Sequence, residues 1–318
     1  MKPTAVVFAY HDVGVRGLLA LIAGGIDVAL VVTHEDDPQE PRWFASVAAT
    51  AREHDLETLM PRDVDAPEVV QRIRAAAPDF FFTLYYRQLL GPALLALPRR
   101  GGYNVHGSLL PAFRGRAPVN WAVLSGARET GASLHELVAR ADAGPLVDRF
   151  AVPILPDDTA FDVHRKVVVA AEIVLTRSLP AILAGTARAT PLDLAAGSYF
   201  GRRTPADGRI DPHWPAARIH DLVRAVSRPY PGAFLDLPSG RLRLWRTRRL
   251  GDSGPAGAPA LLRAAGCVLL RAGDGGLLRV LDAELGDAPC THQALGRILG
   301  GAAALPLSAA DTTFGNTL

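Results

Sequence analysis

Cysteine is almost absent from this chain of 318 residues, which contains only Cys267 and Cys290. Neither lies in a C-x-x-C pair or a Cys/His cluster, so the sequence predicts neither a disulfide framework nor a structural zinc site. We expect both side chains to be reduced and to pack as small hydrophobic groups, and we expect no metal site in the protein.

The sequence also lacks a secretion signal and a long uncharged apolar run. Its first twelve residues, MKPTAVVFAYHD, enter an apolar run that ends too soon for the h-region of a signal peptide. No uncharged apolar run approaches the roughly 20 residues that a helix needs to cross a bilayer. We therefore expect a cytoplasmic protein that does not insert into a membrane.

An excess of charge of one sign is missing as well. The 34 basic and 32 acidic residues leave a formal charge of +2, so no overall basic field is available to hold a nucleic acid, and none is expected as a partner. Lysine occurs only as Lys2 and Lys166, which makes almost every positive charge a guanidinium group. A hydrophobic content of 49% with 21% charged residues is typical of a globular protein.

Short apolar runs alternate with segments of helical length up to about residue 190. Such alternation is typical of βαβ units, and it predicts an α/β fold with a Rossmann-like, mostly parallel sheet covered by helices on both faces. Strands are expected over 4–10, 27–34, 56–61, 80–86 and 101–107, and helices over 17–25, 42–54, 66–77 and 118–126. An antiparallel strand pair is expected over 131–138 and 145–154, followed by a long helix from after Pro156 to Ala184.

The composition changes near residue 197. Residues 197–215 are rich in Gly, Pro and Arg and predict an extended linker. A helix over 216–227 is followed by strand-like runs over 232–238, 241–250, 260–273 and 276–285, and by a late helix over 292–300. These runs fit a smaller barrel-like β domain of the OB type. The expected organisation is a Rossmann-like catalytic domain over 1–200, a barrel-like domain over 201–306 and a tail over 307–318.

Polar residues gather in the otherwise apolar stretch NVHGSLLPAFRGRAPVNW, residues 104–121. Because side chains alternate along a strand, Asn104 and His106 point to the same side. Gly107 and Ser108 then break the strand, which places the pair at its carboxyl end, where open α/β sheets bind ligands. Downstream, the sequence RADAG offers Asp142 among small residues. Taken singly, each of these residues also fits a structural role in a turn or loop.

The three side chains have complementary chemistry. An imidazole transfers protons near neutral pH, and an amide NH2 can donate to an oxyanion that forms during attack on a carbonyl. A carboxylate beside His106 would fix its tautomer and favour its protonated form. The combination of Asn104, His106 and Asp142 therefore predicts catalysis of acyl transfer without a Ser or Cys nucleophile.

Together these residues resemble the folate-dependent formyltransferase family. The family's pattern Asn-x-His, Ser-Leu-Leu-Pro and a later Asp is matched by Asn104, His106, Ser108–Pro111 and Asp142. The resemblance implies that a formyl group is transferred from 10-formyltetrahydrofolate, as co-substrate, to an amine. It also implies that Asn104 and His106 act at the formyl carbonyl while Asp142 supports His106.

Further segments resemble the branch of the family that formylates UDP-4-amino-4-deoxy-L-arabinose in lipid A modification and polymyxin resistance. They are VVFAYHD (6–12), YYR (85–87), RGRAPVNW (114–121), RADAG (140–144), PDD (156–158) and FGRRTP (200–205). This resemblance implies a UDP-amino sugar as the partner substrate. Bifunctional members of the branch also carry an NAD-dependent dehydrogenase/decarboxylase domain. No G-x-G-x-x-G opens a second βαβ region here, so we expect another polypeptide to catalyse that oxidation.

The same resemblance implies ligand contacts. Folate would be contacted by Arg116 and by Val138, Ala139, Arg140, Ala141 and Asp142, with Gln88, Leu89 and Leu90 as further candidates. The amine substrate would be lined by Tyr85, Tyr86 and Arg87, and its diphosphate reached by Arg202 and Arg203, because guanidinium groups suit phosphate oxygens. Structural alternatives stay open: Arg116 can cover a helix end, the tyrosines can be plain sheet-edge residues, and the linker arginines can belong to a solvated turn.

Other acceptors share this chemistry. A methionyl-tRNA formyltransferase would need basic loops for phosphate contacts. Here the loop HEDDPQEPRW carries Glu35, Asp36, Asp37 and Glu40, which would repel a phosphate backbone, although the arginine-rich run over 241–250 favours such contacts. A different nucleotide-sugar N-formyltransferase is not distinguished by the sequence. A folate- or nucleotide-binding regulator without catalysis should have lost the Asn104, His106 and Asp142 trio, which is intact.

Overall fold

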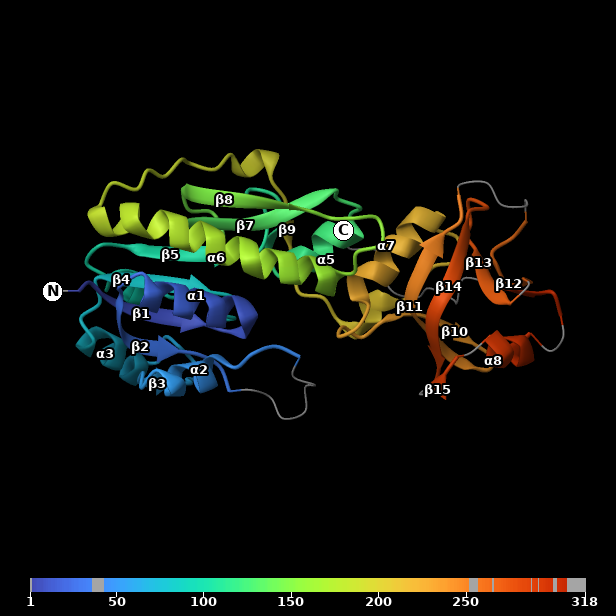
Figure 1. The fold of residues 1–318 in the computed structure, drawn as a ribbon, viewed down its shortest axis with the longest axis horizontal. Helices are drawn as coiled ribbons and strands as arrows, with labels where there is room; N and C mark the ends of the chain where they lie inside the picture. The colour runs from blue at the N-terminus through green and yellow to red at the C-terminus, as the bar shows by residue number, and fades with distance from the viewer. Residues whose placement is uncertain are drawn as a thin grey trace. The chain divides into compact units, whose positions relative to one another are not determined.

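The computed structural model describes residues 2–35, 43–251, 257–264, 266–286, 288–290, 292–299 and 302–307. The chain divides into two compact units (Figure 1). The first comprises Met1–Val119, Glu129–Pro153 and Val163–Gly201, and the second comprises Asn120–Arg128, Ile154–Asp162 and Arg202–Leu318.

A mostly parallel sheet forms the centre of the first unit. Its strand order is β3-β2-β1-β4-β5-β7-β8, and the strands from β3 to β5 are parallel to one another. The strands are β1 (Thr4–Ala9), β2 (Asp27–Val32), β3 (Thr58–Leu59), β4 (Phe80–Leu84), β5 (Gly102–His106), β7 (Glu129–Glu136) and β8 (Leu146–Pro153). Strands β7 and β8 pair antiparallel with each other, as predicted, and β7 also runs antiparallel to β5.

Helices cover both faces of this sheet, which confirms the predicted Rossmann-like α/β class. On one face, Val6 and Phe8 of β1 pack in a core cluster with Ile73 of α3 (Pro67–Ala75) and Leu94 of α4 (Pro92–Leu95). On the other face lies α1 (His11–Ala23), which begins directly after β1 rather than at the expected residue 17. A Cβ on Gly17 would lie 2.6 Å from the Leu84 side chain, so α1 approaches β4 closely because this position has no side chain.

The expected helix between β2 and β3 is shorter than predicted. Helix α2 spans Val47–Glu53, because the Ser46 side chain caps it by accepting a hydrogen bond from the Ala49 N–H. Residues 36–42 lie outside the described part of the chain. The acidic residues Asp36, Asp37 and Glu40 of the sequence argument therefore lie there too, and Glu35 is the only one of the four described.

The long predicted helix is α6, Ala160–Ala184. Thr159 and Asp162 cap its start, since the Thr159 N–H donates to the Asp162 carboxylate and the Asp162 N–H donates to the Thr159 hydroxyl. Helices α1 and α6 lie side by side, joined by the ion pair between Arg16 and Glu172 (Figure 1). Two short strands, β6 (Arg114–Gly115) and β9 (Tyr199–Phe200), pair in parallel, and α5 spans Pro118–Leu124.

By length and composition alone, α6 is long and apolar enough to cross a membrane. It is the one helix of this kind within the described ranges. Side chains spaced along it are fully buried, among them Val163, Val167 and Val174. It also carries Glu172, which pairs with Arg16. Such burial is typical of a core helix in a globular domain.

The second unit is built on a curled antiparallel sheet, in agreement with the expected barrel-like domain. Its strand order is β10-β11-β14-β13-β12-β16, with β15 paired to β14. The strands are β10 (Ala233–Leu237), β11 (Gly240–Arg249), β12 (Ala260–Ala264), β13 (Cys267–Arg271), β14 (Leu277–Leu285), β15 (Ala288–Pro289) and β16 (Ala304–Pro306), and the helices are α7 (Ala216–Val226) and α8 (His292–Ile298).

Two predicted segments of this part of the chain differ from the structure. The run 260–273, expected as one strand, is a hairpin of β12 and β13, because Gly266 at φ +70° turns the chain. The linker 197–215 contains β9 and a short 3-10 helix, Pro205–Gly208. Another short 3-10 helix, Leu194–Ala196, ends directly before it. Of the expected tail, residues 308–318 lie outside the described ranges.

Candidate active site

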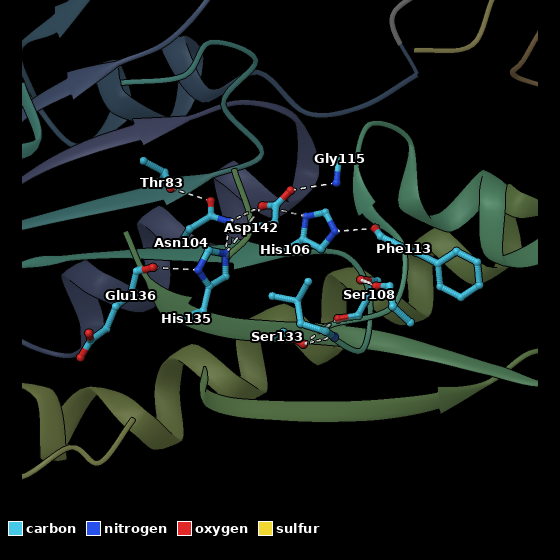
Figure 2. A network of polar contacts seen from close by, with 12 residues as sticks. Thr83, Asn104, His106, Ser108, Phe113, Gly115, Ser133, His135, Glu136 and Asp142 are labelled. Atoms are coloured by element: carbon cyan, nitrogen blue, oxygen red, sulfur yellow. Dashed lines mark hydrogen bonds and ion pairs between the residues drawn. The ribbon is translucent and has the colours of Figure 1, made fainter. Parts of the chain in front are cut away.

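Three neighbouring strands place a row of polar side chains across the sheet. Thr83 of β4 is the register partner of Asn104 of β5, and Asn104 is in turn the partner of His135 of β7. Two residues further along β5, His106 pairs with Ser133 of β7. The period of two along β5 thus puts Asn104 and His106 on one side, as predicted, and the cross-strand pairing supplies them with polar neighbours (Figure 2).

The side chain of Asn104 is held from both ends. Its Oδ1 accepts a hydrogen bond of 2.5 Å from the Thr83 hydroxyl. Its Nδ2 lies 2.9 Å from Nε2 of His135 and donates over 3.5 Å to Oδ1 of Asp142. These contacts fix the orientation of the amide, and the long contact to Asp142 is the weaker of the two that Nδ2 makes.

The hydrogen bonds of His135 indicate its tautomer. Nδ1 lies 2.8 Å from the Glu136 carbonyl oxygen, which can only accept, so Nδ1 carries the hydrogen. In the neutral ring, Nε2 is then free to accept from the Asn104 amide. His135 is 2% exposed, so the surrounding protein keeps this arrangement in place.

Both ring nitrogens of His106 face oxygen atoms. Nε2 donates to the Phe113 carbonyl oxygen over 2.9 Å, and Nδ1 lies 3.4 Å from Oδ1 of Asp142 (Figure 2). Each nitrogen can therefore carry a proton in this setting. His106 is 7% exposed, so both contacts lie in the interior of the first unit.

Asp142 is the centre on which the other groups converge. Its Oδ2 accepts the Gly115 N–H at 2.9 Å, while Oδ1 faces His106, Asn104 and, at 3.7 Å, Nε2 of His135. Burial alone would raise the pKa of this carboxyl, but the charge of His106, with the contacts to His135 and Gly115, outweighs it and holds the pKa well below its usual range. Asp142 is therefore ionised at neutral pH.

The backbone at this loop is strained. Asp142 has a φ of +49°, a conformation that non-glycine residues rarely adopt and that clusters at functional sites. Two residues on, a Cβ at Gly144 would lie 1.9 Å from the Glu136 carbonyl oxygen. The loop can thus lie against the end of β7 only because Gly144 has no side chain, and this close approach positions Asp142.

The serine in the Ser-Leu-Leu-Pro stretch supports the loop. Ser108 is fully buried, and its hydroxyl donates to the Ala112 carbonyl oxygen over 2.6 Å. The Ser133 hydroxyl accepts the Leu110 N–H and donates to the Ser108 carbonyl oxygen. Both hydroxyls are thus engaged in holding the loop after β5 against β7.

The residues expected to contact folate lie in three segments and differ in exposure. The Gln88 side chain bonds to backbone atoms of Pro61, Arg62 and Val64, and Leu90 is buried in a core cluster. Of the three side chains Gln88, Leu89 and Leu90, that of Leu89 is the exposed one. Arg116 is exposed, as are Val138, Ala139 and Arg140, while Ala141 and Asp142 are partly buried.

The residues expected on the amine-substrate side differ in their surroundings. Tyr85 has a φ of +60°, and its hydroxyl lies so close to Gly107 that a Cβ there would meet it at 1.9 Å, which places Tyr85 next to His106. Tyr86 instead packs on the core: its ring stacks on His34 at 4.3 Å and lies 5.6 Å from Phe8.

The remaining arginines of that prediction lie in different units. Arg87 lies over the Tyr10 ring in the first unit, 4.5 Å from its centroid. Arg202 and Arg203 belong to the second unit, where Arg203 lies 4.8 Å from the centroid of Trp121 and donates to the Asp207 carbonyl oxygen. Arg202 is exposed.

His34, two residues after the end of β2, is a further residue that the sequence analysis did not single out. Its Nε2 accepts the Arg87 N–H over 3.0 Å. Burial, with the charges of Arg87 and Arg116, lowers the pKa of His34 to about 4. One expected substrate residue and one expected folate residue therefore act on the same imidazole. A cavity of about 530 Å³ opens beside it, lined by His34, Glu35, Ser46, Ala48, Ala49, Arg52 and Met60.

Two family models match the chain. The family described as formyl transferase matches residues 6–179, more than half of the chain, and the formyl transferase C-terminal domain matches residues 202–296. The chain belongs to the formyl transferase family. As a formyl transferase, it carries Asn104, His106 and Asp142 within the matched N-terminal part.

Several solved structures have a similar fold. The N-formyltransferase of Helicobacter canadensis in complex with folinic acid and dTDP-3-aminofucose is 16% identical, with a TM-score of 0.67 over 88% of this chain and 99% of that one. The sugar N-formyltransferase of a Shewanella species is 16% identical, with a TM-score of 0.62 over 77% and 96%. HypX of Aquifex aeolicus in complex with tetrahydrofolic acid is 15% identical, with a TM-score of 0.61 over 93% of this chain and 46% of that one.

Thr83 and His135 were missed in the sequence because neither belongs to a recognisable motif of its own. Their link to Asn104 comes from the pairing of β4, β5 and β7. The alternation in GASLHELV puts Ser133 and His135 on one face of β7. Only the pairing of β7 with β5 shows that this face lies beside Asn104 and His106 in the formyl transferase.

Proposed function

We propose that this formyl transferase moves the formyl group of 10-formyltetrahydrofolate to the 4-amine of UDP-4-amino-4-deoxy-L-arabinose. The observation that carries the proposal is the convergence of the Asn104 amide and the His106 ring on Oδ1 of Asp142, at 3.5 and 3.4 Å. A formyl carbonyl beside these groups would meet an amide donor and an imidazole together.

The reaction proceeds by direct acyl transfer. The neutral amine attacks the formyl carbon, a C–N bond forms, and the carbonyl oxygen becomes an oxyanion. The bond from the formyl carbon to the folate nitrogen then breaks. The amine loses one proton, and the leaving folate nitrogen gains one, so the protons balance without any further reactant.

Asn104 and protonated His106 stabilise the oxyanion in this mechanism. The Asn104 amide keeps its 2.9 Å contact with His135, and the hydrogen directed at Asp142 is the one that turns to the substrate oxygen because its contact is longer. The His106 Nε2–H exchanges its bond to the Phe113 carbonyl oxygen for one to the substrate. Removing one such donor typically costs about 10²–10³ in rate.

Asp142 acts on His106 rather than on the substrate. Its carboxylate stays ionised because its pKa lies well below the usual range, so its negative charge stays directed at Nδ1 of His106. The Gly115 N–H holds the second carboxylate oxygen and prevents the group from turning away.

Folate contacts are proposed for Arg116, the segment Val138–Asp142, and the backbone of Gln88, Leu89 and Leu90. Exposure of Arg116 and of residues 138–140 next to Asp142 is consistent with this assignment. Fold relatives have been solved with folinic acid or tetrahydrofolic acid, which supports a reduced folate as co-substrate.

Contacts to the amino sugar nucleotide are proposed for Tyr85 and Arg87, with Arg202 and Arg203 at the diphosphate. The contact of Tyr85 with Gly107, beside His106, supports its place on the amine side. Tyr86 is the weakest of the expected contacts because its ring packs on Phe8 and His34. A relative solved with dTDP-3-aminofucose supports a nucleotide-linked amino sugar, and the sequence segments described above favour the arabinose derivative.

The test incubates the protein with 10-formyltetrahydrofolate and each of several acceptors, and mass spectrometry then measures whether the acceptor has gained a formyl group. The acceptors are UDP-4-amino-4-deoxy-L-arabinose, dTDP-3-aminofucose and aminoacylated initiator tRNA. We expect a formyl group only on the arabinose nucleotide, and loss of transfer in His106→Ala but not in His54→Ala, which changes an exposed histidine. Transfer to dTDP-3-aminofucose alone would assign another amino sugar, and transfer to the tRNA would overturn the proposed substrate class.

A further inference from the structure

A second cluster of titratable side chains lies in the first unit, apart from the trio of Asn104, His106 and Asp142. His11 and Asp12 form the start of α1, and His164 comes from the first turns of α6. One ligand-type atom from each of the three residues lies within 4.8 Å of the others. The formyl transfer proposed above uses none of them.

Each of the two imidazoles is buried and has one ring nitrogen without a hydrogen bond. His164 is 3% exposed and His11 is 9% exposed. Neither His164 Nε2 nor His11 Nδ1 has a hydrogen-bond partner among the described residues. A buried polar atom without a partner costs about 1–3 kcal/mol, so two of them facing one carboxylate call for a ligand.

The distances suit coordination better than hydrogen bonding. His11 Nδ1 and His164 Nε2 each lie 3.6 Å from Oδ2 of Asp12, which is too long for a hydrogen bond. Ligand atoms bonded to one zinc ion at about 2.0–2.2 Å with tetrahedral angles are separated by about 3.3–3.6 Å.

The surrounding residues form an apolar wall. The Phe44 ring stacks on His11 at 4.0 Å, and the Trp43 ring lies 4.5 Å from His11 and 5.5 Å from His164. His11 itself has a φ of +67°, a strained conformation for a residue with a side chain, and its ring centroid lies 4.7 Å from that of His164 on α6. An apolar shell of this kind strengthens metal–ligand interactions by excluding water.

We propose that His11, Asp12 and His164 bind a divalent transition-metal ion, with Zn²⁺ as the test ion. Three protein ligands leave a fourth position for water. Two imidazoles and one carboxylate suit Zn²⁺ or Fe²⁺ better than Mg²⁺ or Ca²⁺, which prefer oxygen ligands alone. The sequence predicted no metal site because its search rested on cysteine motifs, whereas these ligands come from segments far apart in the chain.

The ion would join three segments of the first unit. Helices α1 and α6 already lie side by side through Arg16 and Glu172 (Figure 1). Asp12 also accepts the Ala45 N–H at 2.9 Å, just before α2. A metal on Asp12 and His164 would tie α1, α6 and this segment together, so binding should raise the melting temperature.

The test measures bound metal in the full chain. Metal-free protein is dialysed against Zn²⁺, and the bound zinc is counted by mass spectrometry for the wild type, His164→Ala, Asp12→Asn and His54→Ala. We expect about one zinc per chain in the wild type and in His54→Ala, which replaces an exposed histidine, and none above background in the other two. Co²⁺ in the wild type should give the visible absorption of a low-coordinate site with nitrogen ligands.

Two readouts keep the test decisive. Zinc should raise the melting temperature of the wild type and of His54→Ala, and leave that of Asp12→Asn unchanged. Asp12→Asn preserves side-chain size, so it decides the matter if His164→Ala fails to fold. A wild type that binds no zinc, or variants that keep it, would overturn the proposal. Because the readout is metal content, its failure is independent of which acceptor the enzyme formylates.

Discussion

Asp142 holds the Gly115 N–H with one carboxylate oxygen, at 2.9 Å, and directs the other at Nδ1 of His106, at 3.4 Å. The backbone contact thus fixes the direction of the negative charge, and His106 receives it. This relationship explains how Asp142, a loop residue 36 positions after His106, can act on the His106 ring at the end of β5.

Asp142→Asn should lower kcat for formyl transfer by roughly 100-fold or more, because an amide keeps the shape of the group but removes the charge beside His106. KM for the folate should change much less. Steady-state kinetics with both substrates varied will separate the two effects. Asp27→Asn, which changes an exposed carboxylate at the start of β2, serves as the control and should behave like the wild type.

His135 should act as a positioning residue for Asn104. His135→Phe removes the acceptor 2.9 Å from the Asn104 amide and should lower kcat by about 10-fold with little change in KM. His135→Gln keeps a side-chain acceptor and should recover part of that loss. Equal activity of both variants and the wild type would contradict the role, and circular dichroism will show whether His135→Phe is folded.

Gly144→Ala should destabilise the fold, because its Cβ would lie 1.9 Å from the Glu136 carbonyl oxygen. We expect a loss of about 1–3 kcal/mol in the free energy of unfolding, measured by urea denaturation. Gly201→Ala is the matched control, since a Cβ there meets nothing within 4 Å. A neutral Gly144→Ala would show that the loop carrying Asp142 shifts freely.

Acid should weaken the fold through His34. The pKa of His34 is lowered to about 4 in the folded protein, mainly by burial, while the unfolded value is about 6.5. Between these values the unfolded chain binds the proton and the folded chain does not, so the free energy of unfolding falls as the pH falls from about 6.5 to about 4. Above pH 6.5 this effect vanishes.

Urea denaturation at pH 7.5 and pH 5.0 will measure that fall for the wild type, His34→Gln and His54→Gln. His34→Gln should lose less stability between the two pH values than the wild type, because glutamine does not titrate. His54→Gln, at an exposed position, should resemble the wild type. An unchanged fall in His34→Gln would contradict the assignment.

Much of the fold could be predicted from local patterns. Apolar runs such as FFFTL gave β4, and the polarity of NVH placed Asn104 and His106 at a strand end. The geometry of Asp142 beside His106 also followed from the motif, because a specific spacing of three residue types carries more information than any one of them.

The rest depended on contacts between distant segments. His135 gains its meaning from the pairing of β7 with β5, and His11 and His164 meet only because α1 packs beside α6. The Leu90 side chain packs in a core cluster, a contact that its local sequence does not reveal. Such pairings are set by tertiary packing and leave no local signal.

The most direct test of the account is the single-turnover rate of formyl transfer in Asn104→Ala, His106→Ala and the double variant, with the acceptor that the panel identifies. We predict that each single change slows transfer by about 10²–10³-fold, and that the double variant is little slower than the worse single one, because the two donors act on one oxyanion. Transfer at the wild-type rate in folded His106→Ala would contradict the proposed mechanism.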